Sequence, residues 1–306
     1  MKRLIACILL LPLIFCTTFP VQSESGIALD EVASTIEELL NSVTYDDKPI
    51  RDRLVQLESI LLATDVTGPL TDRLERLRKF LLTNDEYGPS VLYKVNALEW
   101  QVFRAIKDGP LIPRIEEIET AVYGEIEEGG IFKRVESLVV DIMPGGQVSR
   151  NKVLIPKGTL IKVRLLTQIN SSTVKVGQVI NCEVVDPIII DNNLVIPADS
   201  KGFAFIEEVH PPGRFGINGK IKMSSFQLRS VDGTFISIGV SERIPSFNET
   251  QAITLGLTAL GFATLGPAGI LTGAFVKGKD LILPIGSEFY VEVFADQEIN
   301  GIPVNM

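Results

Sequence analysis

The chain has 306 residues, with 29 basic and 38 acidic side chains and a formal charge of −9. Apolar residues make up 45% of the chain, which excludes wholesale disorder, and the length is typical of about two domains. The acidic balance argues against a nucleic-acid partner, which needs a clustered basic surface. One His and three Cys leave little material for a zinc site or a histidine-based triad.

Residues 1–23 are predicted to be a secretory signal peptide. Lys2 and Arg3 precede an apolar run over residues 4–15, and a small-residue cleavage pattern ends at Ser23. The run is shorter than the roughly 20 apolar residues that span a bilayer. Neither Cys7 nor Cys16 lies in a lipidation context. We therefore expect an exported chain without a lipid anchor.

Removal of the signal peptide leaves Cys182 as the only thiol of the mature chain. An internal disulfide is then impossible, although export would permit one. Cys182 falls in a strand-like run, so we expect a buried structural cysteine and not a reactive one.

Residues 27–143 are predicted to form helical repeats of about 20 residues. The repeats align on five basic residues spaced by 20 or 21 positions, namely Arg53, Arg73, Lys94, Arg114 and Arg134. Apolar residues three before and one, four and eight after each basic residue share one helix face. Gly-Pro pairs such as Gly68-Pro69 stop one helix and start the next. We expect antiparallel hairpins or a short solenoid, with residues 29–40 as a degenerate first unit.

The acidic excess lies entirely in the helical half. Residues 24–149 contain 13 basic and 24 acidic side chains, whereas residues 150–306 contain 14 of each. Two interpretations stay open: a solvated outer face that keeps the repeats soluble, or a surface for a basic or cation-bridged envelope partner. We assign Glu116, Glu117 and Glu119 to a solvated helix face and not to a catalytic carboxylate pair.

Residues 144–150 read as a linker, and residues 151–299 as an all-β barrel or sandwich. Short strand-like runs separated by turn residues, without helices between them, are typical of such folds. The predicted runs are 160–166, 178–185, 187–190, 203–209, 220–228, 235–240 and 288–294. The predicted fold class is therefore α+β with two domains.

One segment inside the β half is strongly apolar. Residues 252–276 contain no charged side chain and carry a series of helix-breaking residues: Gly256, Gly261, Gly266, Pro267, Gly269 and Gly273. The central Gly-Pro favours two short helices folded into a hairpin over one spanning helix. This hairpin is our candidate surface for membrane or oligomer contact, and packing over the barrel mouth stays open as the alternative.

Two resemblances follow from these motifs. The order IPKGTLIKVRL, INSSTVKVGQVINCEVVDPIII, LVIPADSKGFAFIEEV and LPIGSEFYVEVFADQEI over residues 150–300 resembles the C-terminal β-barrel of TrbI-type scaffold proteins of conjugation and type IV secretion. That resemblance implies a ring-forming barrel with a hydrophobic hairpin that reaches the outer membrane. The Leu-x-x-Arg-Leu-x-x-Leu-Glu units resemble helical repeats of uncharacterised bacterial envelope proteins. The signal peptide, the repeats and the missing proline-rich spacer depart from the TrbI pattern, which favours another envelope assembly.

No residue pattern predicts catalysis, a cofactor or a metal. His210 has no second His to share a metal, and Asp232-Gly233-Thr234 reads as a hairpin turn. We therefore expect a non-enzymatic scaffold of the bacterial envelope, in the periplasm or at the outer membrane, whose partner is an envelope protein or a second copy. The alternatives are a soluble periplasmic module that binds a glycan or peptide and, less favoured, a carboxylate-dependent hydrolase.

Overall fold

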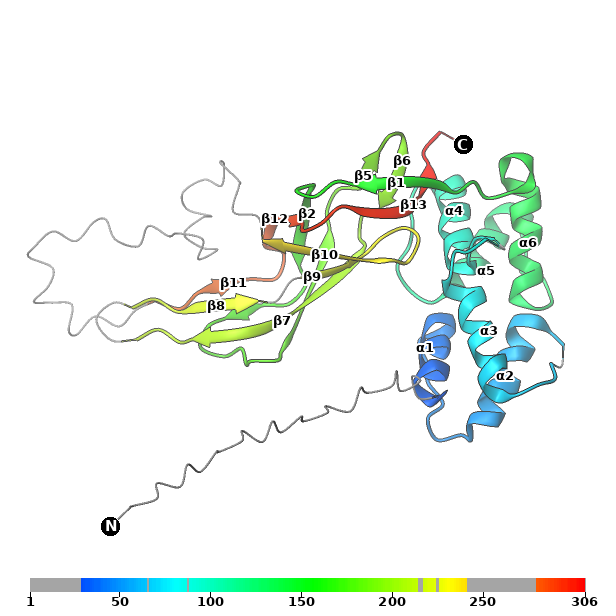
Figure 1. The fold of residues 1–306 in the computed structure, drawn as a ribbon, viewed down its shortest axis with the longest axis horizontal. Coiled ribbons are helices and arrows are strands. Elements are labelled where there is room, and N and C mark those ends of the chain that lie inside the picture. Colours follow the sequence, from blue (N-terminus) through cyan, green and yellow to red (C-terminus); the bar gives the residue numbers. More distant parts are fainter. Residues whose placement is uncertain are drawn as a thin grey trace, which may run out of the picture.

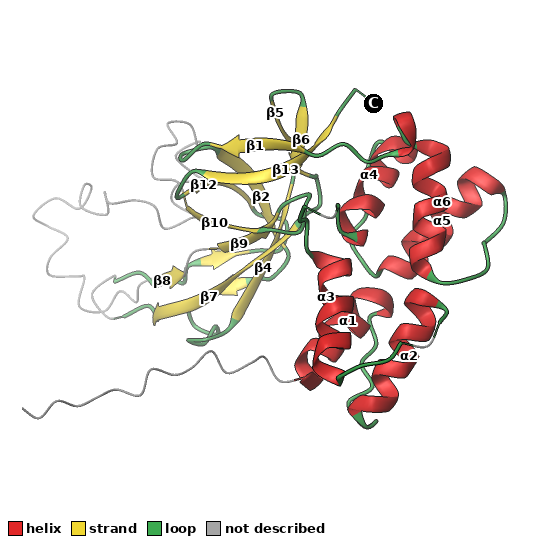
Figure 2. Cartoon of the chain, turned by 45° about the vertical axis from the view of Figure 1, so that its right-hand side comes forward, coloured by secondary structure: helices red, strands yellow, loops and turns green. Residues whose placement is uncertain are grey.

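The computed structural model describes residues 29–64, 66–86, 88–213, 217–223, 226–240 and 279–305 (Figure 1). Helices fill the N-terminal half and strands the C-terminal half, and the two halves lie at opposite ends of the molecule (Figure 2). The predicted α+β class is thereby confirmed. The predicted hairpin over residues 252–276 lies outside the described residues.

The helices are of nearly equal length, as expected for repeats of about 20 residues. They are α1 (Leu29–Asn41), α2 (Ile50–Leu62), α3 (Leu70–Leu82), α4 (Val91–Phe103), α5 (Leu111–Tyr123) and α6 (Ile131–Ile142). Proline directly precedes α2, α3 and α5, where its fixed φ suits a helix start. Gly68 and Gly109 precede two of these prolines with φ of 125° and 124°, a conformation that favours glycine.

The helical units form a closed array and not an open solenoid. Each helix contacts the next, as expected for stacked repeats, but α1 also packs on α5 and α2 on α6. The centre of the predicted apolar stripe is buried, and Leu54, Leu57 and Leu61 of α2 are at most 2% exposed. The stripe is less buried at some helix ends, where Val122 of α5 is 39% exposed.

The closing contact explains why the fifth repeat has lost its proline. Gly130, the N-cap of α6, occupies the position that Pro110 has before α5. A Cβ at residue 130 would lie 2.8 Å from the carbonyl oxygen of Leu61 at the end of α2. Only glycine lets these two backbones approach so closely.

Six of the described strands close into a barrel in the order β4-β2-β12-β10-β9-β7, because β7 pairs with both β9 and β4. A separate sheet, β1-β13-β6-β5, lies beside α4 and α6 (Figure 1). The strands are β1 (Asn151–Ile155), β2 (Leu160–Leu165), β3 (Ile169–Asn170), β4 (Val179–Val184), β5 (Ile188–Ile190), β6 (Asn193–Ile196), β7 (Lys201–His210), β8 (Lys220–Met223), β9 (Phe226–Arg229), β10 (Phe235–Val240), β11 (Ile282–Leu283), β12 (Glu288–Val293) and β13 (Gln297–Pro303).

The structure refines several predicted strands. The run over 220–228 is two strands, β8 and β9, and β13 continues beyond residue 299 to Pro303. At the end of the barrel away from the helices, β8 extends the outer half of β7, and β11 pairs with β3. Residues 241–278 connect β10 to this end and lie outside the described residues.

Alternating side chains fill the barrel interior. Ile161, Val163 and Leu165 of β2 face inward and are fully buried, and the other barrel strands follow the same period of two. Cys182 of β4 is among these inward residues and faces Gly202 of β7 across the pair. The predicted burial of Cys182 is confirmed, and burial raises the pKa of its thiol to about 12.

Candidate functional site

A buried ion pair links most neighbouring helices. The arginine at the fourth position of one helix meets a glutamate at the ninth position of the helix before it. The pairs are Arg53 with Glu37, Arg73 with Glu58, Arg114 with Glu99 and Arg134 with Glu119. Because each guanidinium binds both oxygens of its carboxylate, the pairs fix both the spacing and the orientation of successive helices.

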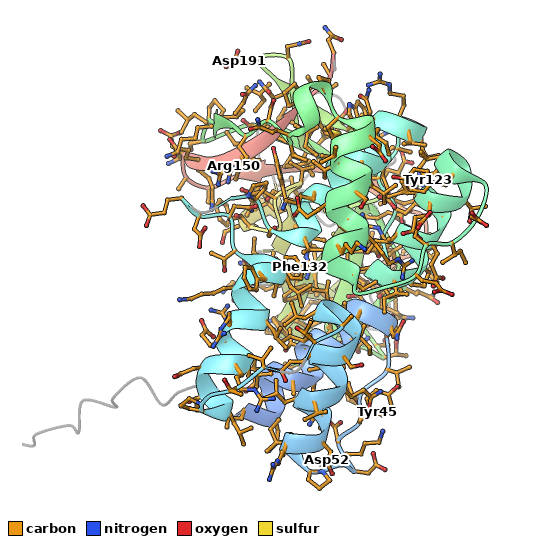
Figure 3. The ribbon with its side chains drawn as sticks, turned by 90° about the vertical axis from the view of Figure 1, so that its right-hand side faces the viewer. Tyr45, Asp52, Tyr123, Phe132, Arg150 and Asp191 are labelled. Carbon is orange, nitrogen blue, oxygen red and sulfur yellow. The ribbon has the colours of Figure 1, made fainter. Side chains whose placement is uncertain are left out.

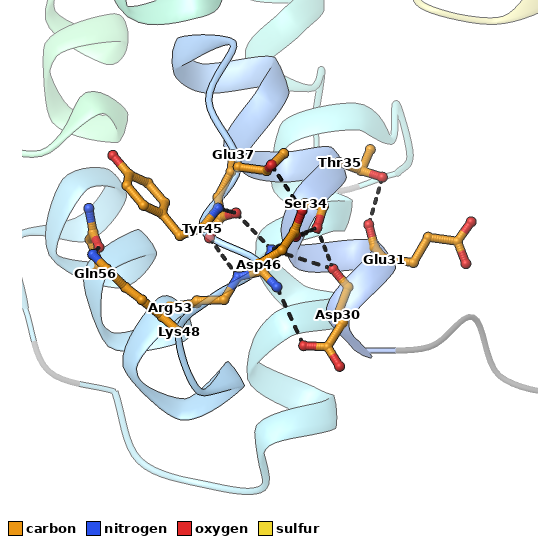
Figure 4. Close-up of polar contacts among 11 residues, drawn as sticks. Asp30, Glu31, Ser34, Thr35, Glu37, Tyr45, Asp46, Lys48, Arg53 and Gln56 are labelled. Carbon is orange, nitrogen blue, oxygen red and sulfur yellow. Dashed lines mark hydrogen bonds and ion pairs between the residues drawn. The ribbon is translucent and has the colours of Figure 1, made fainter.

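The first pair shows how completely these groups are satisfied (Figure 4). Arg53 Nε lies 2.9 Å and Nη2 2.7 Å from the two carboxylate oxygens of Glu37, and the same Nη2 lies 2.7 Å from Ser34 Oγ. The two paired side chains are only 1% and 2% exposed. Hydrogen bonding to Glu37 raises the pKa of Arg53, so the guanidinium stays charged at any physiological pH.

The same carboxylates also bind the connection between the helices. The Tyr45 amide donates to Glu37 Oε2 (3.0 Å), the Lys107 amide to Glu99 Oε2 (2.9 Å) and the Glu127 amide to Glu119 Oε2 (3.3 Å). Each of these glutamates therefore holds a helix and a loop together. A buried charge without such partners would be strongly destabilising.

This arrangement corrects the interpretation of Glu119. We predicted Glu116, Glu117 and Glu119 on one solvated face, but Glu119 is fully buried against Arg134. Glu117 is exposed and pairs with Lys107. The error arose because a single helix was considered, whereas the arginine partner of Glu119 comes from the next repeat.

The junction between α3 and α4 departs from the pattern. Arg78 occupies the ninth position of α3, where the other paired helices have glutamate, and it bonds Glu75 on its own helix. Lys94, at the fourth position of α4, pairs with Glu136 of α6. This junction therefore lacks an ion pair between consecutive helices.

The α3–α4 connection instead contacts the β half. Asn84 Nδ2 donates to the carbonyl oxygen of Asp232 at 3.0 Å, while its Oδ1 accepts from the Ser90 amide at 2.8 Å. Arg150, just before β1, donates to the carbonyl oxygen of Asp85. Figure 3, viewed from the helical side, shows Arg150 at the boundary between the two halves.

Two buried polar side chains of α4 complete this boundary. Asn96 donates to the carbonyl oxygen of Val231 (2.7 Å) and accepts from Arg114 (2.6 Å), so one of the ion pairs is connected directly to the barrel. The Tyr93 hydroxyl lies 2.8 Å from the carbonyl oxygen of Gly301 and 3.1 Å from that of Ser149. Burial raises the pKa of Tyr93, so its hydroxyl stays a donor.

Asp232 stabilises the turn between β9 and β10, which α4 contacts through Asn96. Its Oδ1 accepts from Ser230 Oγ and the Thr234 amide, and its Oδ2 accepts from the amide and the side chain of Asn300. Asp232 is 3% exposed. The prediction of a structural turn at Asp232-Gly233-Thr234 is confirmed, because every carboxylate lone pair is engaged.

A cleft of about 280 Å³ opens between the two halves. One wall comes from α4 and the α4–α5 connection, and the other from the turn before β7 and from β7, β9 and β10. Polar side chains on both walls face the cleft, among them Lys107, Asp108, Asn181, Asp199 and Arg229.

Aromatic side chains cover the barrel wall of this cleft. Phe203 makes edge-to-face contacts with Phe205 and Phe235, at ring-centroid distances of 5.9 and 6.1 Å. The guanidinium of Arg229 lies 5.2 Å from the centre of the Phe235 ring. Phe205 and Phe235 are 45% and 46% exposed, although phenylalanine is usually buried.

Sequence analysis missed this aromatic surface, which we call the phenylalanine stripe (Phe203, Phe205 and Phe235). A signal was present: in the run Gly-Phe-Ala-Phe over 202–205 the small residues alternate with the aromatic ones. The small residues face the barrel interior, so the rings face outward. The run was interpreted only as a strand.

The remaining predicted residues make no site in the described part of the chain. Gly256, Gly261, Gly266, Pro267, Gly269 and Gly273 lie outside the described residues. His210 is exposed at the end of β7, with Nε2 3.5 Å from a Glu208 oxygen. Within the described ranges, no three His, Cys, Asp or Glu side chains are grouped to hold a metal ion. None of the helices so described is long and apolar enough to cross a membrane.

Comparison with known proteins gives weak likeness to solved structures and no match to a family. No protein-family model matches the sequence, and no curated protein is significantly similar to it. Among solved structures, the chain is similar to ComB10 of the Com type IV secretion system of Helicobacter pylori. The sequence identity is 12% and the TM-score 0.27, over 47% of this chain and 88% of that chain. A likeness at this level does not establish the TrbI-type family that the sequence resembles.

Proposed function

We propose that the chain is a non-enzymatic scaffold protein of the bacterial envelope, exported to the periplasm and joined there to an envelope protein or to a second copy of itself. In this proposal the helical repeats and the barrel act as one body with two separate contact surfaces. Its barrel is then a TrbI-like module used in a different envelope assembly, and residues 252–276 are its contact with the outer membrane or with a neighbouring copy.

The observation that carries the proposal is the set of hydrogen bonds across the boundary between the halves. Asn96 donates to a carbonyl oxygen of the β9–β10 turn of the barrel, and Tyr93 donates to a carbonyl oxygen of β13 in the separate sheet. Both side chains are buried, and Asn84 and Arg150 add bonds at the edge of the boundary. Hydrogen bonds between buried groups hold two parts in one orientation, because leaving them unmade costs free energy. A fixed orientation is what a scaffold requires and what two independent binding domains would not need.

The different character of the two ends of the molecule supports the same proposal. The acidic helices lie at one end, and β10 ends and β11 begins near the other end (Figure 1). A partner at the helical end and a membrane or second copy at the far end can then be bound together.

Fractionation of cells tests the scaffold proposal. The full chain and a variant lacking residues 252–276 are expressed with the signal peptide, fractionated, purified and measured by light scattering. We expect the full chain in the outer-membrane fraction or in a large oligomer, and the deletion variant as a monomer that keeps its helical and β circular dichroism. Two monomers of equal solubility would contradict the proposal.

The cleft between the halves favours a second candidate, a soluble periplasmic binding module. Exposed aromatic rings beside polar side chains are typical of binding sites, and the cleft offers both. The two candidates are compatible, because the described residues that line the cleft lie outside residues 252–276 in the sequence.

A further inference from the structure

We infer that the cleft between the helices and the barrel binds a glycan chain, with its sugar rings against the phenylalanine stripe. The inference rests on the second proposed function, that of a binding module, and names the class of its ligand. It does not depend on the scaffold proposal.

The first observation is the exposure of the stripe. Phe203 and Phe235 line the cleft, and Phe205 continues the surface along β7. Each ring presents apolar carbon to water at a cost, and pyranose rings have an apolar face of C–H groups that covers such a surface. The hydroxyl groups of the sugar then point sideways, toward the rim of the cleft.

The second observation is the rim itself. Hydroxyl groups both donate and accept hydrogen bonds, so a sugar site needs donors and acceptors together. The cleft provides Arg229 as donor, Asp108 and Asp199 as acceptors and the amide of Asn181 as both. In the described part of the chain, no carboxylate pairs with Arg229; its guanidinium lies over Phe235, so its N–H groups are available to a ligand.

The third observation argues against an extended peptide. A peptide usually binds such a sheet by pairing with a free strand edge. The strands under the stripe are internal to the closed barrel: Phe203 pairs with Asn181 on one side and Gln227 on the other, and Phe235 pairs with Arg229. Phe203 lies between two paired strands and Phe235 is paired with β9, so the outward side chains offer the main contact surface.

Binding of a defined oligosaccharide tests the inference. Residues 24–306 are titrated with chitotetraose, a β-1,4-linked N-acetylglucosamine tetramer, by calorimetry, and in parallel with a proline decapeptide. We expect saturable binding of chitotetraose and none of the peptide. Phe235→Ala should weaken the affinity by about tenfold, the loss expected when one aromatic contact is removed.

Two variants serve as controls. Phe80→Ala removes a phenylalanine of nearly equal exposure (45%) that packs on Phe132 of α6 and is not among the described residues that line the cleft. The affinity of this variant should equal that of the unmodified chain. Phe235→Trp keeps an aromatic surface and should retain binding, which separates loss of the platform from loss of folding.

Three results would overturn the inference. Peptide binding that depends on Phe235 would preserve the binding-module proposal and exclude the glycan. Absence of binding to both probes at millimolar concentration would reject the glycan site and remove the support for a binding module. Equal losses in Phe80→Ala and Phe235→Ala would place any binding elsewhere on the molecule.

Discussion

Two junctions between helices, α3–α4 and α5–α6, are held in place by different interactions. Between α5 and α6, Glu119 binds Arg134 and the connecting loop, so the repeats hold each other. Between α3 and α4, Arg78 replaces the glutamate and the loop binds the barrel through Asn84 and Asp85. The ion pair between consecutive helices is therefore absent at a junction whose loop binds the β half.

The comparison shows that the same buried polar chemistry serves two purposes. At the regular junctions a charge pair fixes helix against helix, and at the α3–α4 junction hydrogen bonds to main-chain carbonyl oxygens fix the helices against the β half. Asn96 connects the two systems, because it accepts from Arg114 and donates to Val231. The following substitutions test this difference between the regular junctions and the α3–α4 junction.

The largest effect is expected from breaking a regular pair. Arg134→Ala leaves Glu119 charged and fully buried, which should lower the free energy of unfolding by about 3–5 kcal/mol. Arg78→Ala at the irregular junction removes a partly exposed pair within one helix and should cost less than about 1 kcal/mol. Urea unfolding of both variants measures the difference, and equal costs would show that the regular pairs have no special role.

Asn96→Ala removes the side chain that connects the Arg114–Glu99 ion pair to the barrel. It leaves the carbonyl of Val231 and one N–H of Arg114 without their partner, for an expected loss of about 3 kcal/mol. We also expect the helices and the barrel to unfold at separate urea concentrations in this variant. A single transition shifted to lower urea would mean that the remaining bonds still couple the halves.

Gly130→Ala tests the closure of the helical array. The added Cβ would clash with the end of α2, and relief of the clash by backbone shifts should cost about 2 kcal/mol. Proteolysis should then cut first near residue 130. A variant as stable as the unmodified chain would show that α2 and α6 need not meet.

Tyr93→Phe has the smallest effect and a characteristic pH dependence. Loss of the hydrogen bond to Gly301 should cost about 1 kcal/mol at neutral pH. Burial raises the pKa of Tyr93 above its ordinary value of 10.0, so its contribution is complete below pH 10 and is lost as pH rises further. The unmodified chain should therefore lose stability above pH 10 more steeply than the variant, as measured by thermal unfolding across that range.

Much of the fold could be predicted because its signals are local. The positions of α2 to α6 follow from the apolar stripe and the Gly-Pro pairs, and most barrel strands follow from alternation and turn residues. Short strands such as β3 and β11 were missed, since two residues carry no period. The closed array was not predicted, because the approach of α2 to α6 shows in the sequence only as a proline replaced by Gly130.

The candidate site was harder to predict because it is made by residues far apart in the chain. Lys107 and Asp108 come from the helical half and Asp199, Phe203 and Arg229 from the barrel. None of them belongs to a motif on its own. The same reason hid the partners of Glu119 and Asp232, whose burial depends on segments that the fold brings together.

The central claim, that helices and barrel are one body, is tested most directly by unfolding residues 24–306 with two probes. Trp100 of α4 is the only tryptophan and reports on the helices. Cys182 is the only cysteine within residues 24–306 and reports on the barrel interior. Trp100 fluorescence and the reactivity of the Cys182 thiol are followed across one urea series. We predict coincident midpoints; two separated midpoints would contradict the claim.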